Sequence, residues 1–265
     1  MSRRRRWLMP FLLLTVLCAC AAAGPKSGPQ AAPRRLRYEV VKVYPHDPAA
    51  YTQGLLWRDG SLYESTGQWG QSSLRRVDLE TGKVLQKSDL DARLFGEGLA
   101  LLGDKLYQLT WESGLGFVYD RATFRRLSSF SYATEGWGLA VLGTDLVMSD
   151  GSSVLSVRDP ETFAELRRIR VEDDRGPVVY LNELETIDGR IYANIYQTDR
   201  VVIINPESGR VEADVDFRGL LPASDRRPNT DVLNGIAWDA KAQRLFVTGK
   251  NWPRLYQVRL IPAAR

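Results

Sequence analysis

The stretch FGEGLALLGDKLYQLTW, residues 95–111, contains the pattern on which the fold prediction rests. A glycine-rich lead-in with one acid is followed by a short apolar segment, a turn with Gly and Asp, and a second segment rich in Leu and Tyr. Apolar runs of this length, bounded by turn residues, are typical of two antiparallel strands joined by a hairpin. The carboxylate of Glu97, placed just before a buried strand, is therefore a candidate for chemistry rather than for packing.

The same pattern occurs four more times in the chain. The other copies are YTQGLLWRDGSLYEST from Tyr51, EGWGLAVLGTDLVMSDG from Glu135, YLNELETIDGRIYANIY from Tyr180 and VLNGIAWDAKAQRLFVTGK from Val232. The equivalent positions are Gln53, Glu97, Trp137, Asn182 and Asn234, whose residue numbers differ by 44, 40, 45 and 52. A repeat of this length predicts one four-stranded sheet per copy.

Further strand pairs lie between the copies, such as residues 73–90 and 201–217 with turns at ETG and ESG, and no helical period of useful length occurs. Repeated antiparallel sheets predict an all-β, five-bladed β-propeller with four-stranded blades around a central channel. The strands YEVVKVYP (38–45) and RLYQVRL (254–260) are expected to share a blade and close the ring. A β-sandwich is the alternative fold, but it would not predict a fivefold period.

The N-terminus predicts export. Arg3 to Arg6 precede an apolar stretch, residues 7–17, that is too short to span a bilayer. The following Leu-Cys-Ala-Cys resembles a bacterial lipobox with Cys20 as the lipidated residue, and the alternative is an ordinary signal peptide cleaved near Ala22. We therefore expect a lipoprotein signal at 1–20, a flexible Pro/Gly/Ala-rich tether at 21–36, and a catalytic propeller at 37–265, held to a membrane in the periplasm by lipid only.

The charge balance excludes a class of partner. The formal charge of +4 comes from 36 basic and 32 acidic residues, and the four signal arginines account for all of it. The mature protein is nearly neutral, which argues against a nucleic-acid partner.

Both cysteines lie in the signal, so we expect no internal disulfide, and we expect a monomer stabilised by packing alone.

The repeats also predict a pocket. The start of the first strand and the end of the second lie at the same channel mouth, so residues about 14 apart in a copy should be neighbours. The second set of positions is Gly67, Trp111, Gly151, Tyr196 and Lys250. Together the two sets carry one acid and one cation and differ from copy to copy, as an asymmetric pocket requires. Glu64, only 11 residues after Gln53, should not reach this mouth.

Longer motifs carry a family resemblance. YPHDPAAYTQGL, LYESTGQWGQSSLRRVDLETGKV, FGEGL, EGWGL, LNELE and VTGKNWPRLYQV resemble the plant and bacterial type of glutaminyl-peptide cyclotransferase, over about residues 38–258. The resemblance implies a five-bladed propeller that converts the N-terminal glutamine of peptides or proteins to pyroglutamate and releases ammonia. It implies Glu97 as the proton-handling residue. The implied substrate-binding residues are Tyr51, Gln53, Phe95, Trp111, Trp137, Asn182, Tyr196 and Lys250. Tyr51 and Tyr196 replace the phenylalanine and tryptophan common in that family, and both keep an aromatic face.

The chemistry suits these residues. A free α-amine has a pKa of about 7.7 to 8.0, so a base must take a proton from it, and the departing ammonia must receive one. One carboxylate can do both if apolar surroundings raise its pKa. Asn182, Lys250 and the tryptophan N–H groups are candidates to hold the amide oxygen.

We expect neither a metal nor another cofactor. His46 is the only histidine, so a zinc site with the usual nitrogen and sulfur ligands cannot be assembled, and His46 is expected to order the turn before the first copy. Two other functions remain open. A binding scaffold would tolerate loss of Glu97, and a lactonase-like hydrolase would need more acidic or histidine ligands.

Overall fold

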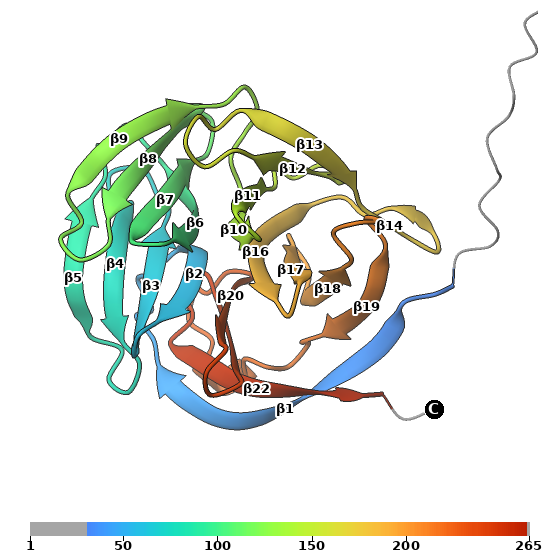
Figure 1. Cartoon of the computed structure of the whole chain (residues 1–265). Helices are drawn as coiled ribbons and strands as arrows, with labels where there is room; N and C mark the ends of the chain where they lie inside the picture. Colours follow the sequence, from blue (N-terminus) through green and yellow to red (C-terminus); the bar gives the residue numbers. More distant parts are fainter. Residues whose placement is uncertain (1–30, 264–265) are drawn as a thin grey trace, which may run out of the picture. The chain divides into compact units, whose positions relative to one another are not determined.

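The computed structural model describes residues 31–263, which form an all-β, β-propeller-like fold of 22 strands without an α-helix (Figure 1). The predicted signal, the lipobox with Cys20 and most of the tether lie outside these residues. In this part of the chain, no helix has the length and apolar character that crossing a membrane requires.

Three antiparallel sheets have four strands each, in chain order. The first contains β2 (Thr52–Arg58), β3 (Ser61–Thr66), β4 (Ser73–Asp78) and β5 (Val84–Asp89). The second contains β6 (Gly96–Leu102), β7 (Lys105–Thr110), β8 (Leu115–Asp120) and β9 (Arg126–Ser131). The third contains β10 (Leu139–Leu142), β11 (Asp145–Met148), β12 (Val154–Arg158) and β13 (Glu165–Arg170). Each corresponds to one copy of the sequence repeat and the hairpin after it.

The remaining long strands form one eight-stranded sheet in the order β16-β17-β18-β19-β1-β22-β21-β20. Its strands are β1 (Arg34–Pro45), β16 (Leu181–Ile187), β17 (Arg190–Ile195), β18 (Arg200–Ile204), β19 (Val211–Asp216), β20 (Leu233–Asp239), β21 (Arg244–Gly249) and β22 (Arg254–Pro262). A short hairpin of β14 (Glu172–Asp173) and β15 (Gly176–Pro177), and the 3-10 turn η1 (Ala223–Asp225), complete the fold.

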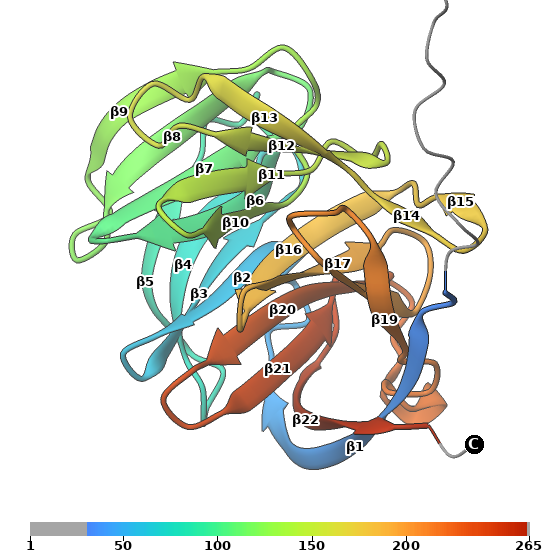
Figure 2. The same ribbon diagram turned by 45° about the vertical axis from the view of Figure 1, so that its right-hand side comes forward.

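The two ends of the described chain lie side by side. β1 pairs antiparallel with β22, from Leu36 opposite Pro262 to Pro45 opposite Arg254, which confirms the predicted pairing of the terminal strands (Figure 2). β1 also pairs in parallel with β19 through residues 34–36. The folded part therefore begins before the predicted boundary at Arg37. The Pro, Gly and Ala content of residues 21–36 predicted a tether up to this point, but the Arg35 guanidinium pairs with the buried Asp214 carboxylate at 2.8 Å.

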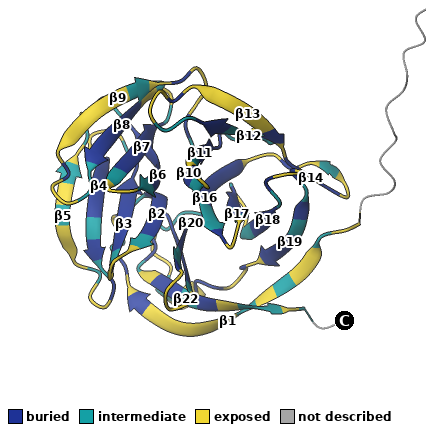
Figure 3. Cartoon of the chain, in the orientation of Figure 1, coloured by how far each residue is buried: buried dark blue, intermediate teal, exposed yellow. Residues whose placement is uncertain are grey.

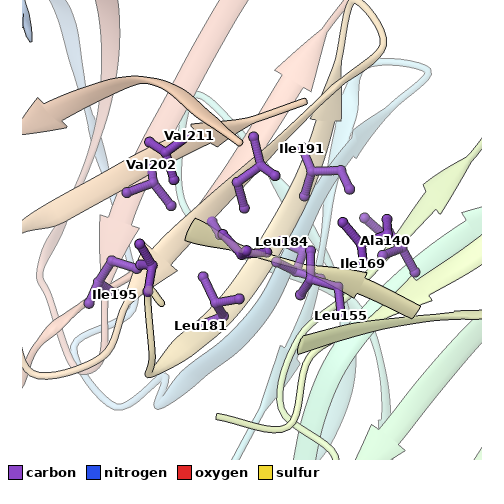
Figure 4. Close-up of a cluster of buried hydrophobic side chains, with 14 of the residues drawn as sticks. Ala140, Leu155, Ile169, Leu181, Leu184, Ile191, Ile195, Val202 and Val211 are labelled. Carbon is purple, nitrogen blue, oxygen red and sulfur yellow. The ribbon is translucent and has the colours of Figure 1, made fainter. Parts of the chain in front are cut away.

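The first strands β2, β6, β10, β16 and β20 follow one another around the central axis, each in contact with the next. Burial decreases from these strands outward, and β5, β9 and β13 are largely exposed (Figure 3). The core therefore lies between adjacent sheets. Figure 4 shows the cluster between the third sheet and β16–β19, which includes Ala140, Leu155, Ile169, Leu181, Leu184, Ile191, Ile195, Val202 and Val211.

Four of the five first strands contain an irregularity near their start. The strand register shifts between Thr52 and Gly54, Gly96 and Leu99, Leu181 and Leu184, and Leu233 and Ile236. β-Bulges of this kind turn side chains out of the regular alternation and occur next to active sites. The residues inside the shifts include Gln53, Glu97, Asn182 and Asn234. These are the positions that the repeat alignment identified.

A glycine follows the equivalent position in four of the five copies, and close approach of the first strands explains three of them, Gly54, Gly98 and Gly138. A Cβ at Gly54 would lie 2.5 Å from the Leu99 amide nitrogen, and one at Gly98 would lie 2.5 Å from the Leu139 amide nitrogen. A side chain there would force the strands apart. At the equivalent position of β16 the residue is Glu183, and the structure accommodates it by pointing its carboxylate toward two other strands.

The Glu183 carboxylate joins three first strands. Its Oε1 accepts the Leu55 N–H of β2 at 3.2 Å, and its Oε2 accepts the Ile236 N–H of β20 at 2.9 Å. Both donors lie just after bulges, where the regular strand pairing is interrupted. Glu183 is 1% exposed, and its burial raises the pKa of the carboxyl well above the usual range. This residue therefore satisfies backbone groups that would otherwise be unpaired.

Candidate active site

The predicted site residues meet in one pocket at the mouth of the ring, with a cavity volume of about 190 Å³. Its lining residues are Tyr51, Gln53, Gln68, Phe95, Glu97, Trp111, Trp137, Asn182, Tyr196 and Lys250. All nine side chains expected from the sequence are present, and the structure adds Gln68. Gln68 lies two residues after the end of β3 and has a positive φ of 91°. That conformation gives no signal in the repeat pattern.

The strands position these residues through a common backbone arrangement. The amide nitrogens of Trp111, Tyr196 and Lys250 donate to the carbonyls of Phe95, Tyr180 and Val232, at 3.0, 2.9 and 2.9 Å. Each acceptor lies two residues before the position that the sequence count paired with the donor. These backbone hydrogen bonds join residues 16 or 18 apart, and the side chains predicted to be neighbours from a spacing of about 14 line the same pocket.

Glu97 is a buried carboxylate with a single hydrogen-bond donor from a side chain. It is 4% exposed, and Gln53 Nε2 donates to its Oε1 at 2.8 Å. Burial raises the pKa of Glu97 well above its ordinary value, the charge of Lys250 opposes this effect, and the charge of Glu135 adds to it. These surroundings disfavour the ionised form of the carboxyl group, as is common at functional sites.

Lys250 lines the same pocket and is 3% exposed. Burial lowers the pKa of its ammonium, although Glu97 and Asp231 favour the charged form. The ammonium nitrogen lies 4.9 Å from the ring centre of Tyr51 and 5.0 Å from that of Tyr196, so two aromatic faces stabilise it. The Tyr51 hydroxyl donates to Asp231 Oδ2 at 2.9 Å, which fixes that ring.

The aromatic wall consists of edge-to-face pairs. Phe95 and Trp111 have ring centres 5.6 Å apart, and Trp137 and Tyr196 have ring centres 5.4 Å apart. Tyr51 contacts Phe95 in the same way, at 6.1 Å. This geometry is favourable for neighbouring aromatic rings and keeps each plane in a defined orientation. The wall therefore has a fixed shape before a ligand enters.

Glu135 is a second site residue that sequence reasoning missed. Its Oε2 accepts the indole N–H of Trp111 at 2.7 Å and that of Trp137 at 2.8 Å. The expectation that the tryptophan N–H groups hold a substrate oxygen is therefore wrong for this arrangement, because both already have an acceptor. The only signal in the sequence was the place of Glu135 directly before GWGL.

The asparagines have different positions. Asn182 lines the pocket, is 3% exposed, and its Oδ1 has no hydrogen-bond partner among the described residues. Asn234 lies behind the lining, where its Nδ2 donates to the Thr52 carbonyl at 2.9 Å and to Gln53 Oε1 at 3.3 Å. Asn234 thus orients Gln53, which in turn holds Glu97.

Glu64 and His46 lie outside the pocket. His46 Nε2 contacts Glu64 Oε1 at 3.0 Å, and its Nδ1 contacts the Trp252 carbonyl at 2.7 Å. Thr52 Oγ1 also donates to Glu64 Oε1, at 2.7 Å. His46 therefore orders the turn before β2, as expected. Within residues 31–263, no three His, Cys, Asp or Glu side chains form a group suited to a metal ion.

The fold and site together define an enzyme of the β-propeller-like class, with a small preformed pocket at the channel mouth. The chain belongs to the glutamine cyclotransferase family, whose sequence profile matches residues 12–260. It is 46% identical over 232 residues to the glutaminyl-peptide cyclotransferase of Arabidopsis thaliana, covering 85% of this chain and 72% of that protein.

A solved structure gives the same result. The crystal structure of Myxococcus xanthus glutaminyl cyclase matches with a TM-score of 0.82 at 38% sequence identity. The match covers 88% of this chain and all of that one. The family resemblance expected from the motifs is confirmed.

Proposed function

We propose that this protein is a glutaminyl-peptide cyclotransferase that converts an N-terminal glutamine to pyroglutamate and releases ammonia, with Glu97 as the proton carrier. Membership of the family and the similarity to two glutamine-cyclising proteins support the activity. One observation supports the role of Glu97: its carboxylate is buried in an aromatic pocket, with burial raising its pKa. Such a group can exchange a proton with an amine near neutral pH.

The reaction needs one carbon–nitrogen bond to form and one to break. The α-amine of the substrate attacks the side-chain amide carbon, after Glu97 takes a proton from the α-ammonium. Glu97 then returns this proton to the amide nitrogen of the tetrahedral intermediate, which leaves as ammonia. The new ring nitrogen loses its extra proton to solvent, where ammonia takes it up as ammonium. Nucleophile and electrophile belong to the same residue, so the pocket mainly has to fold the side chain into the attacking conformation. The rings of Phe95, Trp111, Trp137 and Tyr196 supply that shape.

The amide oxygen gains negative charge as the ring closes. The Lys250 ammonium and the Asn182 side-chain amide border the same cavity as Glu97 and are the groups that we assign to this oxygen. The indole N–H groups are already bonded to Glu135 and do not take this role. Gln53, through its bond to Glu97 Oε1, keeps the carboxylate directed at the reacting nitrogen atoms.

We also propose that the ring has five blades. The eight-stranded sheet consists of two runs of four strands, β16–β19 and β20–β22 with β1, and the runs meet only where β1 pairs in parallel with β19 over residues 34–36. Every other strand pairing in that sheet is antiparallel. Counting each run as one blade gives five, which agrees with the five copies in the sequence.

The cell location is a separate proposal that rests on sequence. We propose that the protein is exported, carries lipid on Cys20, and acts as a monomer in the periplasm. Replacing Cys20 with Ser should move the protein from the membrane fraction to the soluble periplasmic fraction, or leave its signal uncleaved. A Cys20→Ser protein that is processed normally and stays in the membrane would show that this cysteine is not the anchor.

The activity is tested by incubating the purified protein with a peptide that begins with glutamine. Ammonia release and a matching loss of one ammonia from the peptide mass are expected, and the same peptide with an acetylated α-amine should not react.

Dialysis against a strong chelator should leave the cyclising activity intact, whereas a loss of activity that zinc restores would contradict a metal-free reaction. A peptide that binds without releasing ammonia would instead favour a binding scaffold.

A further inference from the structure

Glu135 lies on the rim of the pocket, in the segment between β9 and β10, and its side chain is exposed. The adjoining backbone is fixed, because the Gly136 N–H donates to the Trp111 carbonyl at 2.9 Å. A Cβ on Gly136 would lie 2.5 Å from the Tyr132 hydroxyl, so the chain passes too close to its neighbours for a larger residue. Glu135 is thus held at a defined place although it faces solvent.

One oxygen of this carboxylate connects the two halves of the aromatic wall. Oε2 accepts both indole N–H groups, and each indole packs edge-to-face against another lining ring. Trp111 packs against Phe95, and Trp137 packs against Tyr196. Hydrogen bonds to an ionised acceptor are shorter and stronger than those between neutral groups. Four of the rings that line the pocket are therefore linked through Glu135.

The charge of Glu135 also acts on the site. Among the described residues it forms no ion pair with Lys or Arg, so its negative charge is not neutralised locally. The titratable groups that face Glu97 are Lys250, Glu135, Tyr51 and Tyr132. Lys250 favours the ionised form of Glu97, and Glu135 raises the Glu97 pKa. Both tyrosines have a raised pKa and stay neutral in the working range.

We propose that Glu135 is a positioning residue for the cyclisation, which holds the indoles of Trp111 and Trp137 as one wall and keeps Glu97 able to carry a proton. This inference rests on the proposed function. The two parts of the role are separable by substitution. A glutamine at this position keeps an oxygen that accepts the indole N–H groups but removes the charge, and an alanine removes both.

The experiment compares the pH dependence of kcat/KM, and kcat and KM separately, for the wild type, Glu135→Gln, Glu135→Ala and Glu112→Gln. Glu112 is an exposed carboxylate directly after Trp111 that makes no bond to an indole, so it is the matched control for loss of rim charge. Thermal unfolding of each variant checks the fold. All assays use a glutamine-initiated peptide.

For Glu135→Gln we expect KM within about threefold of the wild type and an acidic limb of the profile moved to lower pH by roughly half a unit to one unit, because a like charge near Glu97 has been removed. For Glu135→Ala we expect the same shift together with a KM increase of about tenfold or more, as the wall loses its link. Glu112→Gln should change neither quantity.

Two results would overturn the inference. The first is a Glu135→Gln profile that coincides with that of Glu112→Gln, which would show that the charge does not act on Glu97. The second is an unchanged KM in Glu135→Ala, which would show that the indoles do not need this acceptor. Either result leaves the proposed function standing as long as the wild type releases ammonia, whereas an inactive wild type would refute the function itself.

Discussion

Three buried glutamates have different partners, and the partners decide what each can do. Glu97 receives one side-chain N–H and shares a cavity with a lysine that does not contact it as an ion pair. Glu64 is bonded to an imidazole and a hydroxyl. Glu183 accepts two backbone N–H groups. Only Glu97 borders the pocket, so only it can exchange a proton with a substrate there.

Glu97→Gln should remove catalysis without unfolding the protein. We expect turnover to fall roughly 10² to 10⁴-fold, the usual loss for a general acid–base residue. Burial raises the pKa of Glu97, so ionising it in the folded state at neutral pH costs stability, and the neutral amide should unfold at the same or a higher temperature. Turnover and thermal unfolding at pH 7 measure the two effects. A fully active variant would show that another residue carries the proton.

Glu64→Gln should have the opposite effects to Glu97→Gln. It should lower the stability of the protein and leave turnover per folded molecule normal. Burial alone would lower the pKa of His46, but the charge and hydrogen bond of Glu64 raise it overall. Burial alone would raise the pKa of Glu64, but His46 and Arg75 lower it overall. Breaking such a buried pair typically costs about 3–5 kcal/mol.

The pH dependence of the stability lost in Glu64→Gln follows from the raised pKa of His46 and the lowered pKa of Glu64. The raised His46 pKa gives stability that is complete below its unfolded pKa of about 6.5 and is lost as pH rises through the folded pKa. The lowered Glu64 pKa gives stability that is complete above about 4.3 and is lost as pH falls through the folded pKa. Urea unfolding should therefore show the largest difference between wild type and Glu64→Gln at about pH 4.5 to 6.5. A difference that does not vary between pH 5 and 9 would contradict this assignment.

At the scale of the strand, the sequence predicted the first strands of the repeats but not the bulges within them. The period of the repeats indicated the first strands and their equivalent positions, because alternation and turn residues are local properties. Each bulge adds one residue to the first strand without a change in composition, so the strand register at the mouth was not predictable. Glu135 was missed for a related reason: its contacts depend on how Trp111 and Trp137 orient their indoles.

Glu183→Ala should destabilise the ring at the point where three first strands meet. The substitution leaves the Leu55 and Ile236 N–H groups buried without an acceptor, and each such group costs about 1–3 kcal/mol. We expect a loss of roughly 2–5 kcal/mol in the free energy of unfolding. Glu185→Ala is the control, because Glu185 lies on the same strand but bonds to no other sheet. Equal losses from the two variants would refute the bridging role.

At the scale of the whole molecule, the ring is closed by pairing between its two ends rather than by a covalent link. β22 has β21 on one side and β1 on the other, so removing β1 would expose the edge of β22 to solvent. The sequence predicted this closure, because both terminal segments read as strands without a partner of their own. It did not predict the parallel contact of residues 34–36 with β19, which depends on the buried partner of Arg35.

Two shortened chains test the closure. A protein that begins at Arg37 loses the three parallel pairs with β19, the Leu36–Pro262 pair with β22 and the Arg35–Asp214 ion pair. It keeps the rest of β1 and should remain folded and active, with a melting temperature lowered by a few degrees. A protein that begins at Asp47 loses β1 entirely and should be insoluble or aggregated, since β22 then presents an unpaired edge. Gel filtration and ammonia release distinguish the two. A soluble, active protein beginning at Asp47 would show that β1 is dispensable.

Closure by the two ends also sets the order in which the site is completed during synthesis. Tyr51 and Gln53 leave the ribosome early, but Lys250 follows almost 200 residues later, and β22 follows Lys250. Contacts this distant in sequence form slowly, because a long loop of chain must close before they contribute. A nascent chain that lacks β22 has the acid and most of the aromatic wall, but neither the lysine in place nor the antiparallel partner of β1. The enzyme therefore cannot act on any glutamine before nearly all of its strands have been made.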